Sequence, residues 1–147
     1  MRVGLVIYGS LDLISGGFLY DRMLVRELRA AGVDVSVIAL PWRRPGGALA
    51  ENLEPWPAQL HSCDLVLQDQ LIHPAVFDRN PRLGRPIVAL VHNLTCPPGT
   101  VSLPAAVERR YFDTVDGVIG VCADSLAQVR ALAPALPGVV ARAVSAG

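Results

Sequence analysis

The feature that most constrains the fold of this chain is the way its apolar residues are grouped. Val, Leu, Ile and Ala come in short runs, such as those in Arg2–Tyr8 and Ile87–Val91, that do not alternate between apolar and polar residues. Strands of this composition are buried on both faces, which is the usual situation in a parallel sheet. Helical spacing between the runs indicates crossovers from one strand to the next. The sequence therefore predicts an α/β fold: a Rossmann-like three-layer sandwich with a mainly parallel sheet of about six strands.

The runs and the residues that begin or end helices define the expected elements. Strands are predicted at Arg2–Tyr8, Val33–Ala39, Asp64–Gln68, Ile87–Val91, Gly117–Val121 and Val139–Val144. Helices are predicted at Phe18–Ala31, from Pro104 to about Thr114, and from an N-cap at Asp124 or Ser125 to about Ala133. The segment Pro41–Pro57, rich in Pro, Gly and Trp, is expected to be irregular.

The first helix has an apolar stripe at helical spacing. We expect Leu19, Met23, Leu24 and Leu28 to face the sheet and Asp21 to lie off this stripe with the arginines. Gly32 follows the last helical residues and is a natural C-cap, because it adopts left-handed backbone angles without a Cβ penalty.

Composition narrows the class of protein. Hydrophobic residues make up 52% of the 147 residues, yet charged residues interrupt every run before it could span a membrane. Thirteen basic and thirteen acidic side chains cancel, which argues against a general nucleic-acid binder. No signal-peptide pattern opens the chain, and its three widely spaced cysteines indicate reduced thiols. We therefore expect a single domain of a cytoplasmic protein with no transmembrane segment, with peripheral membrane association left open.

Ligands of open parallel sheets bind outside the carboxyl ends of the strands, and two loops there carry candidate residues. After the first strand, Gly16 and Gly17 open the first helix, where their backbone N–H groups could approach an anion. The alternative is that the two glycines only make a tight turn. The dinucleotide fingerprint G-x-G-x-x-G is absent in every register, which disfavours NAD binding.

The loop after the fourth predicted strand begins with His92 and Asn93. A histidine in this position could donate a hydrogen bond to a sugar hydroxyl or a phosphate, or act as an acid or base. The alternative is a capping or structural role. His61 and His73 have no comparable setting and are expected to be surface or packing residues.

No metal site is predicted. His61 with Cys63, or His92 with Cys96, supplies two ligands at most, whereas a closed zinc site needs four.

Two groups of arginines remain. Trp42, Arg43 and Arg44 follow the second predicted strand and could bind a phosphate or a membrane-associated acceptor, although a solvated loop is the commoner role of such a cluster. The arginines around Pro81, at positions 79, 82 and 85, are expected to be solvated loop charges.

Several stretches resemble one known family. The opening "MRVGLVIYGSLDLISGGFLYDRMLVRELRAAGVDVSVIAL", the segments "DLVLQDQLIHPAVF" and "RPIVALVHNL", and "ERRYFDTVDGVIGVCADSLAQV" follow one another in the order and spacing of the acceptor-side domain of retaining glycosyltransferases with the GT-B fold. The chain is similar over essentially its whole length to that domain in glycosyltransferase family four.

The resemblance implies a cleft between two Rossmann-like domains, with the acceptor on this one and most of a nucleotide-sugar donor on a C-terminal domain. Gly16 and Gly17 match the loop near the donor phosphates and the transferred sugar, and His92 matches the histidine near the reaction centre. The resemblance also implies metal independence, no tightly bound cofactor, and a sugar, lipid or small-molecule acceptor. The chain departs from the family pattern at Asn93, where another histidine is common, and at Cys122, where serine is common.

The sequence ends at Gly147, about where the linker to the donor-binding domain is expected, so we expect negligible transfer by this chain alone. Two other readings stay open. One is a non-catalytic binding or regulatory module that pairs with a separate donor-binding domain. The other is a small flavin- or nucleotide-binding domain unrelated to sugar transfer.

Overall fold

A computed structural model describes residues 1–41 and 56–140 of the chain. Its centre is a sheet in which all neighbouring strands are parallel, in the order β2-β1-β3-β4-β5-β6. The strands are β1 (Arg2–Tyr8), β2 (Asp34–Leu40), β3 (Leu65–Asp69), β4 (Ile87–Val91), β5 (Gly117–Gly120) and β6 (Gly138–Val140). The predicted α/β class, the parallel sheet and the number of strands are confirmed.

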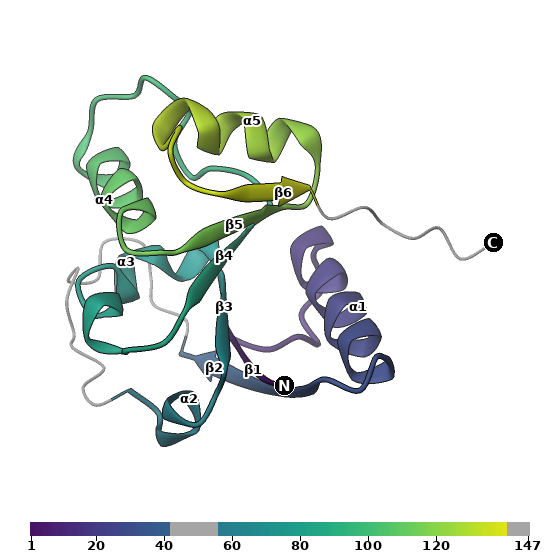
Figure 1. Cartoon of the computed structure of the whole chain (residues 1–147). Coiled ribbons are helices and arrows are strands. Elements are labelled where there is room, and N and C mark those ends of the chain that lie inside the picture. The colour runs from purple at the N-terminus through teal and green to yellow at the C-terminus, as the bar shows by residue number, and fades with distance from the viewer. Residues whose placement is uncertain (42–55, 141–147) are drawn as a thin grey trace.

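Helices cover both faces of this sheet and make the three layers (Figure 1). One face carries α1 (Gly16–Ala30), which packs on β1 and β2 through Phe18 and Val25. The other face carries α2 (Ala58–His61), α3 (His73–Val76), α4 (Leu103–Phe112) and α5 (Ala123–Leu132), with the 3-10 turns η1 (Gln70–Ile72) and η2 (Asn80–Arg82). Among the described residues, no helix is both long and apolar enough to cross a membrane.

Both ends of α1 are capped, and the C-terminal cap at Gly32 is the predicted one. The Ser15 hydroxyl accepts from the N–H of Phe18 at 3.2 Å. At the other end, Gly32 has a φ of +83°, and its N–H donates to the carbonyl of Arg29 while the N–H of Val33 donates to that of Leu28. These two bonds form a Schellman motif, which explains why a glycine follows the helix.

The buried face of α1 matches only half of the predicted stripe: Leu24 and Leu28 pack against the core, as expected. Leu19 and Met23 are 50% and 46% exposed, whereas Asp21 is completely buried between Phe18 and Val25. The prediction followed hydrophobicity, but the helix turns a carboxylate inward, and its partner lies on a distant loop.

The start of α5 was also predicted wrongly. Its N-cap is Cys122, two or three residues before the expected Asp124 or Ser125, and the thiol accepts from the N–H of Ser125 at 3.5 Å. Cysteine is not among the usual capping residues, so propensity pointed past it to the nearest oxygen-bearing side chains.

Arg79 is not the solvated charge that was expected. Its side chain is buried, with the guanidinium carbon 4.6 Å from the centre of the Trp56 ring. The Trp56 indole N–H donates to the Arg79 carbonyl at 3.4 Å. This pair joins the segment before α2 to the turn before η2, a cation–π contact that sequence spacing does not reveal.

Candidate functional site

The loops that follow β1, β3 and β4 meet at one edge of the sheet. These three strands are parallel neighbours, so their carboxyl ends lie side by side. The loop after β1 leads into α1, β3 ends at Asp69, and β4 ends one residue before His92. The polar residues at these ends form the group that we call the His92 cluster: Asp21, Asp69 and His92.

His92 is held by the first turns of α1. Its Nε2 lies 3.1 Å from Oδ1 of Asp21, and its ring meets the ring of Tyr20 edge-on, with centroids 5.5 Å apart. A Cβ added to Gly17 would lie 3.5 Å from Cδ2 of the imidazole. The side chain of His92 keeps 17% of its surface exposed, whereas that of Asp21 has none. The imidazole is therefore fixed on the α1 side and open to solvent elsewhere.

Asp69 completes the cluster from β3. It is 2% exposed, and it caps the turn η1, because its Oδ1 accepts from the N–H of Leu71 within that turn. Burial raises the pKa of Asp69 to about 6. The hydrogen bond from Leu71 partly offsets this effect, and the negative charge of Asp21 adds to it. One ligand atom from each of Asp21, Asp69 and His92 lies within 4.8 Å of the others. Within the described ranges this is the only group of three such side chains with metal-ligand geometry, so the space between them could take either a cation or a proton.

The acidic neighbours control the charge of His92. Burial lowers the pKa of the imidazole, but the hydrogen bond and the charge of Asp21, together with the charge of Asp69, more than offset this and raise it above the usual value. The site therefore favours the protonated form of His92, which donates hydrogen bonds.

Further hydrogen bonds from buried side chains fix the loop after β4. The hydroxyl of Ser125 donates to the carbonyl of His92 at 2.5 Å. The buried carboxylate of Glu108 on α4 accepts from the N–H groups of Thr95 and Cys96 at 2.7 and 3.0 Å, and from the side-chain amide of Gln70. Because these partners come from α4, α5 and η1, the loop is tied to three elements beneath it.

The residues proposed from the sequence have different outcomes. Gly17 and His92 are brought together, as described above. Gly16 has no atom near its would-be Cβ, and Asn93 is exposed. The proposed acceptor residues Trp42, Arg43 and Arg44 lie outside the described residues. His61 is at the surface and His73 in the core, as expected, with the His73 Nδ1 2.9 Å from the carbonyl of Gln70.

Sequence reasoning missed Asp21 and Asp69. Asp69 could have been found, because it is the last residue of a buried strand that neighbours β4. Asp21 gave a weaker signal: it lies three residues after Phe18 and four before Val25, a spacing that places all three on one helical face.

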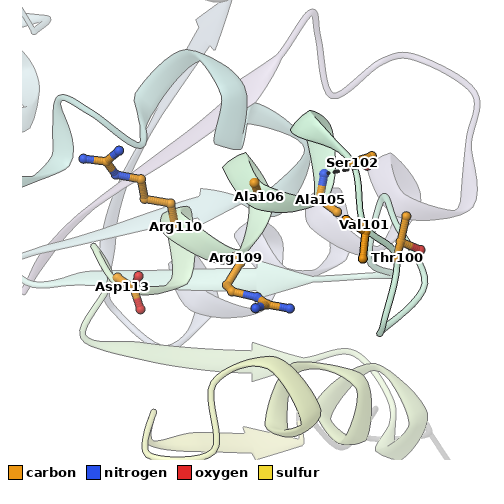
Figure 2. A pocket seen from close by; sticks show the side chains of 8 residues that line it. All are labelled: Thr100, Val101, Ser102, Ala105, Ala106, Arg109, Arg110 and Asp113. Atoms are coloured by element: carbon orange, nitrogen blue, oxygen red, sulfur yellow. Dashed lines mark hydrogen bonds between the residues drawn. The ribbon is translucent and has the colours of Figure 1, made fainter.

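A shallow hollow of about 400 Å³ lies along α4 and the loop before it (Figure 2). Its walls include Thr100 and Val101 at one end and Arg109, Arg110 and Asp113 at the other. Its lining residues are exposed, apart from the half-buried Ala105, and none belongs to the His92 cluster. The buried titratable groups therefore mark the candidate site better than this hollow does.

Comparison with known proteins identifies a structural neighbour but no family. No protein-family model and no curated protein match the sequence. Crystal structures of Anabaena Alr3699/HepE superimpose on the chain with TM-scores of 0.51 for the complex with UDP and glucose and 0.50 for the complex with UDP. Each is 18% identical, and the match covers 95% of this chain and 43% of the HepE chain. The chain thus shares a fold with part of HepE and spans less than half of its length.

Proposed function

We propose that this chain is the N-terminal, acceptor-binding half of a retaining, metal-independent glycosyltransferase of the GT-B fold, within glycosyltransferase family four. In this proposal the donor is a nucleotide sugar, held mainly by a C-terminal domain of the same or another chain. The acceptor is a sugar, a lipid or a small molecule.

The observation that carries the proposal is the contact between Gly17 and His92. The two residues come from separate loops, yet the backbone of Gly17 lies against the imidazole at the carboxyl edge of the sheet. This arrangement places the first N–H groups of α1, which have no carbonyl partner within the helix, beside a histidine that can donate hydrogen bonds. An anionic group and a neighbouring hydroxyl could be bound together there.

The neighbouring structures support the same ligand class. HepE has been crystallised with UDP and with glucose, and this chain matches 43% of its length, which suits one of two domains. In such an enzyme His92 would contact the transferred sugar, and the first turn of α1 would face the donor phosphates. Charge on the leaving diphosphate would be neutralised mainly by basic groups of the other half.

Titration of the 15N-labelled chain with UDP-glucose tests the proposal without the second half. We expect the amide signals of Gly17 and His92 to shift, and those around the exposed His61 to stay in place. The titration extends to about 10 mM donor, so that millimolar binding is detected. FMN and NAD serve as competing ligands. Shifts at the same amides with either of these, or none with UDP-glucose, would contradict the proposal.

Transfer assays test the catalytic role. The chain alone is expected to transfer negligible sugar, because half of the transition-state contacts belong to the donor-binding domain. Joined to that domain, His92→Ala should lower kcat/KM about 100-fold or more, the usual effect of removing a donor near the reacting charge. His61→Ala is the matched control and should leave the rate unchanged. Equal rates for the two variants would remove His92 from the mechanism.

A further inference from the structure

The His92 cluster gathers three side chains that can each donate a lone pair to a metal ion. They come from α1, from the end of β3 and from the loop after β4, and one ligand atom of each lies within 4.8 Å of the other two. Asp21 and Asp69 are 0% and 2% exposed, whereas most aspartates lie at the surface. Two carboxylates and an imidazole are therefore held together where water reaches them poorly.

The separations between these atoms suit a single bound ion. Zinc holds nitrogen and oxygen ligands at about 2.0–2.2 Å, so the ligands of one such ion lie about 3 Å apart when adjacent and about 4.3 Å apart when opposite. Nε2 of His92 and Oδ1 of Asp21 are 3.1 Å apart, which is the spacing of adjacent ligands. The ligand atom of Asp69 lies within 4.8 Å of both other side chains, so small side-chain movements would complete the set.

One oxygen of the cluster has no hydrogen-bond partner. Oδ2 of Asp21 is fully buried and accepts no hydrogen bond from any residue that the structure describes. Leaving a buried carboxylate oxygen in this state is costly, and such oxygens are ordinarily satisfied by a donor or a cation. Oδ1 of the same carboxylate contacts His92, so the side chain points into the cluster. The unpartnered oxygen therefore indicates a ligand independently of the spacing.

The cluster also has more acidic than basic groups. In residues 1–41 and 56–140, the one ion pair that either aspartate forms is that between Asp21 and His92. Arg22, next to Asp21 in the sequence, donates instead to the carbonyl of Leu11. Two carboxylates outweigh one imidazolium even when His92 is protonated, whereas a divalent cation would balance both.

We propose that Asp21, Asp69 and His92 bind one divalent transition-metal ion, such as Mn²⁺ or Zn²⁺. Carboxylate oxygens and imidazole nitrogen together favour such ions over Mg²⁺ and Ca²⁺, which prefer oxygen ligands alone. The ion takes the place of the proton between Nε2 of His92 and Asp21, because a histidine that binds a metal gives up its proton. Three protein ligands leave at least one position for water, which reaches the site past the exposed part of His92.

The bound ion joins three segments that are far apart in the sequence, which is why spacing along the chain did not predict it. It ties α1 to β3 and to the loop after β4 at the carboxyl edge of the sheet. With Nε2 on the metal, the imidazole keeps its proton on Nδ1 and can still donate a hydrogen bond. The inference does not depend on the proposed function, in which the transfer step itself uses no metal.

Binding of Mn²⁺ to the 147-residue chain tests the proposal. The chain is stripped with EDTA and dialysed, and free Mn²⁺ is measured by EPR at pH 7.5, where Asp69, with its pKa of about 6, is mostly ionised. We expect one Mn²⁺ per chain with a Kd of about 100 µM or below. About a tenfold excess of Mg²⁺ should leave most of the Mn²⁺ bound. No saturable binding, or complete displacement by Mg²⁺, would overturn the proposal.

Isosteric variants locate the bound ion. Asp21→Asn and Asp69→Asn each replace a carboxylate by an amide of the same shape and should weaken Mn²⁺ binding about 10-fold or more, since even indirect partners of a metal have effects of this size. Asp78→Asn removes an exposed carboxylate and is the matched control, which should bind Mn²⁺ as the unsubstituted chain does. Equal affinities for Asp69→Asn and Asp78→Asn would overturn the proposal.

A measurement on the unsubstituted chain needs no variant to fold. Mn²⁺ broadens the NMR signals of nearby nuclei, so substoichiometric Mn²⁺ should first broaden the amide signals of Asp21, Asp69 and His92 in the 15N-labelled chain. The signals of His61 and of the exposed Asp34, at the start of β2, should persist. Broadening at exposed carboxylates with the three cluster signals intact would overturn the proposal. The UDP-glucose titration is run in EDTA, so its failure would contradict the proposed function alone.

Discussion

Replacing Asp69 by asparagine should change how the stability of the chain depends on pH. The pKa of this carboxyl is about 6 in the folded chain, compared with 3.8 for an unperturbed group. The folded state therefore binds more protons than the unfolded state between these values, and its stability falls as the pH rises through them. The difference is about two pH units, which at 1.36 kcal/mol for each unit corresponds to about 3 kcal/mol. Asp69 is 2% exposed, so solvent screening does not reduce this figure appreciably.

Asparagine keeps the shape of the side chain and the acceptor for the N–H of Leu71, but it does not titrate. The difference in free energy of unfolding between the unsubstituted chain and the variant, measured by urea denaturation, should therefore be larger at pH 4 than at pH 7.5. The change in that difference is expected to be about 2–3 kcal/mol, a little less than the full value because the unfolded carboxyl is already partly ionised at pH 4. Taking the difference between the two chains cancels the titration of groups that they share.

Asp78→Asn is the matched control, because it removes an exposed carboxylate. Its difference from the unsubstituted chain should be the same at both pH values. If Asp69→Asn gave a difference as flat as that of the control, the carboxyl of Asp69 would be ionised at the same pH in both states, and the reasoning from its burial would be refuted.

Other predictions concern packing, the loop after β4 and the thiols. Gly120→Ala places a Cβ 3.0 Å from a backbone nitrogen on α5 and should lower the free energy of unfolding by about 1–3 kcal/mol. Gly16→Ala meets no atom within 4 Å and should be neutral or stabilising by up to about 1 kcal/mol. Equal melting temperatures for the two variants would contradict this prediction. Glu108→Gln weakens a buried acceptor of three N–H groups, so it should lower the free energy of unfolding by about 2–3 kcal/mol. It should also speed amide hydrogen exchange in the loop after β4, and an unchanged exchange rate there would contradict the prediction. Iodoacetamide should modify the exposed Cys122 much faster than Cys63, which is 3% exposed and whose thiol pKa is raised by burial. Mass spectrometry of the labelled peptides measures the rate at each cysteine, and equal rates would contradict the prediction.

The sheet was predictable because its signal is local. Every run of Val, Leu and Ile that was assigned to a strand is a strand in the part of the chain that the structure describes, and Arg2–Tyr8 and Ile87–Val91 match to the residue. Strands buried on both faces need no partner information to be recognised. The predicted end of the last strand, Val144, lies outside the described residues, which extend to β6 at Gly138–Val140.

The site was only partly predictable because its contacts join distant parts of the sequence. Gly17 and His92 could be chosen individually, from a glycine pair before a helix and a histidine after a strand. The hydrogen bond between Asp21 and His92 spans 71 residues, and the local pattern of α1 gives only the spacing of Asp21 from Phe18 and Val25, which does not reveal the partner. The thiol cap at Cys122 and the buried guanidinium of Arg79 were missed for the same reason, since propensity describes average environments and these residues occupy unusual ones.

The buried polar groups fall into two kinds, and the difference identifies the site. The side-chain amides of Gln68 and Asn80 form two hydrogen bonds with each other, and Glu108 accepts hydrogen bonds from three N–H groups. These polar groups have partners and support the fold. In contrast, Oδ2 of Asp21 and the hydroxyl of Tyr111 are buried without a partner among the described residues; beyond the effect of burial, the charge of Asp21 raises the pKa of Asp69, and the charge of Asp69 raises the pKa of Tyr111. An apolar residue at position 21 would suit the buried face of α1 better, so the carboxylate costs stability where it stands. Such a cost at the carboxyl edge of a parallel sheet, beside a histidine that keeps 17% of its side-chain surface exposed, is more readily explained by ligand binding than by folding.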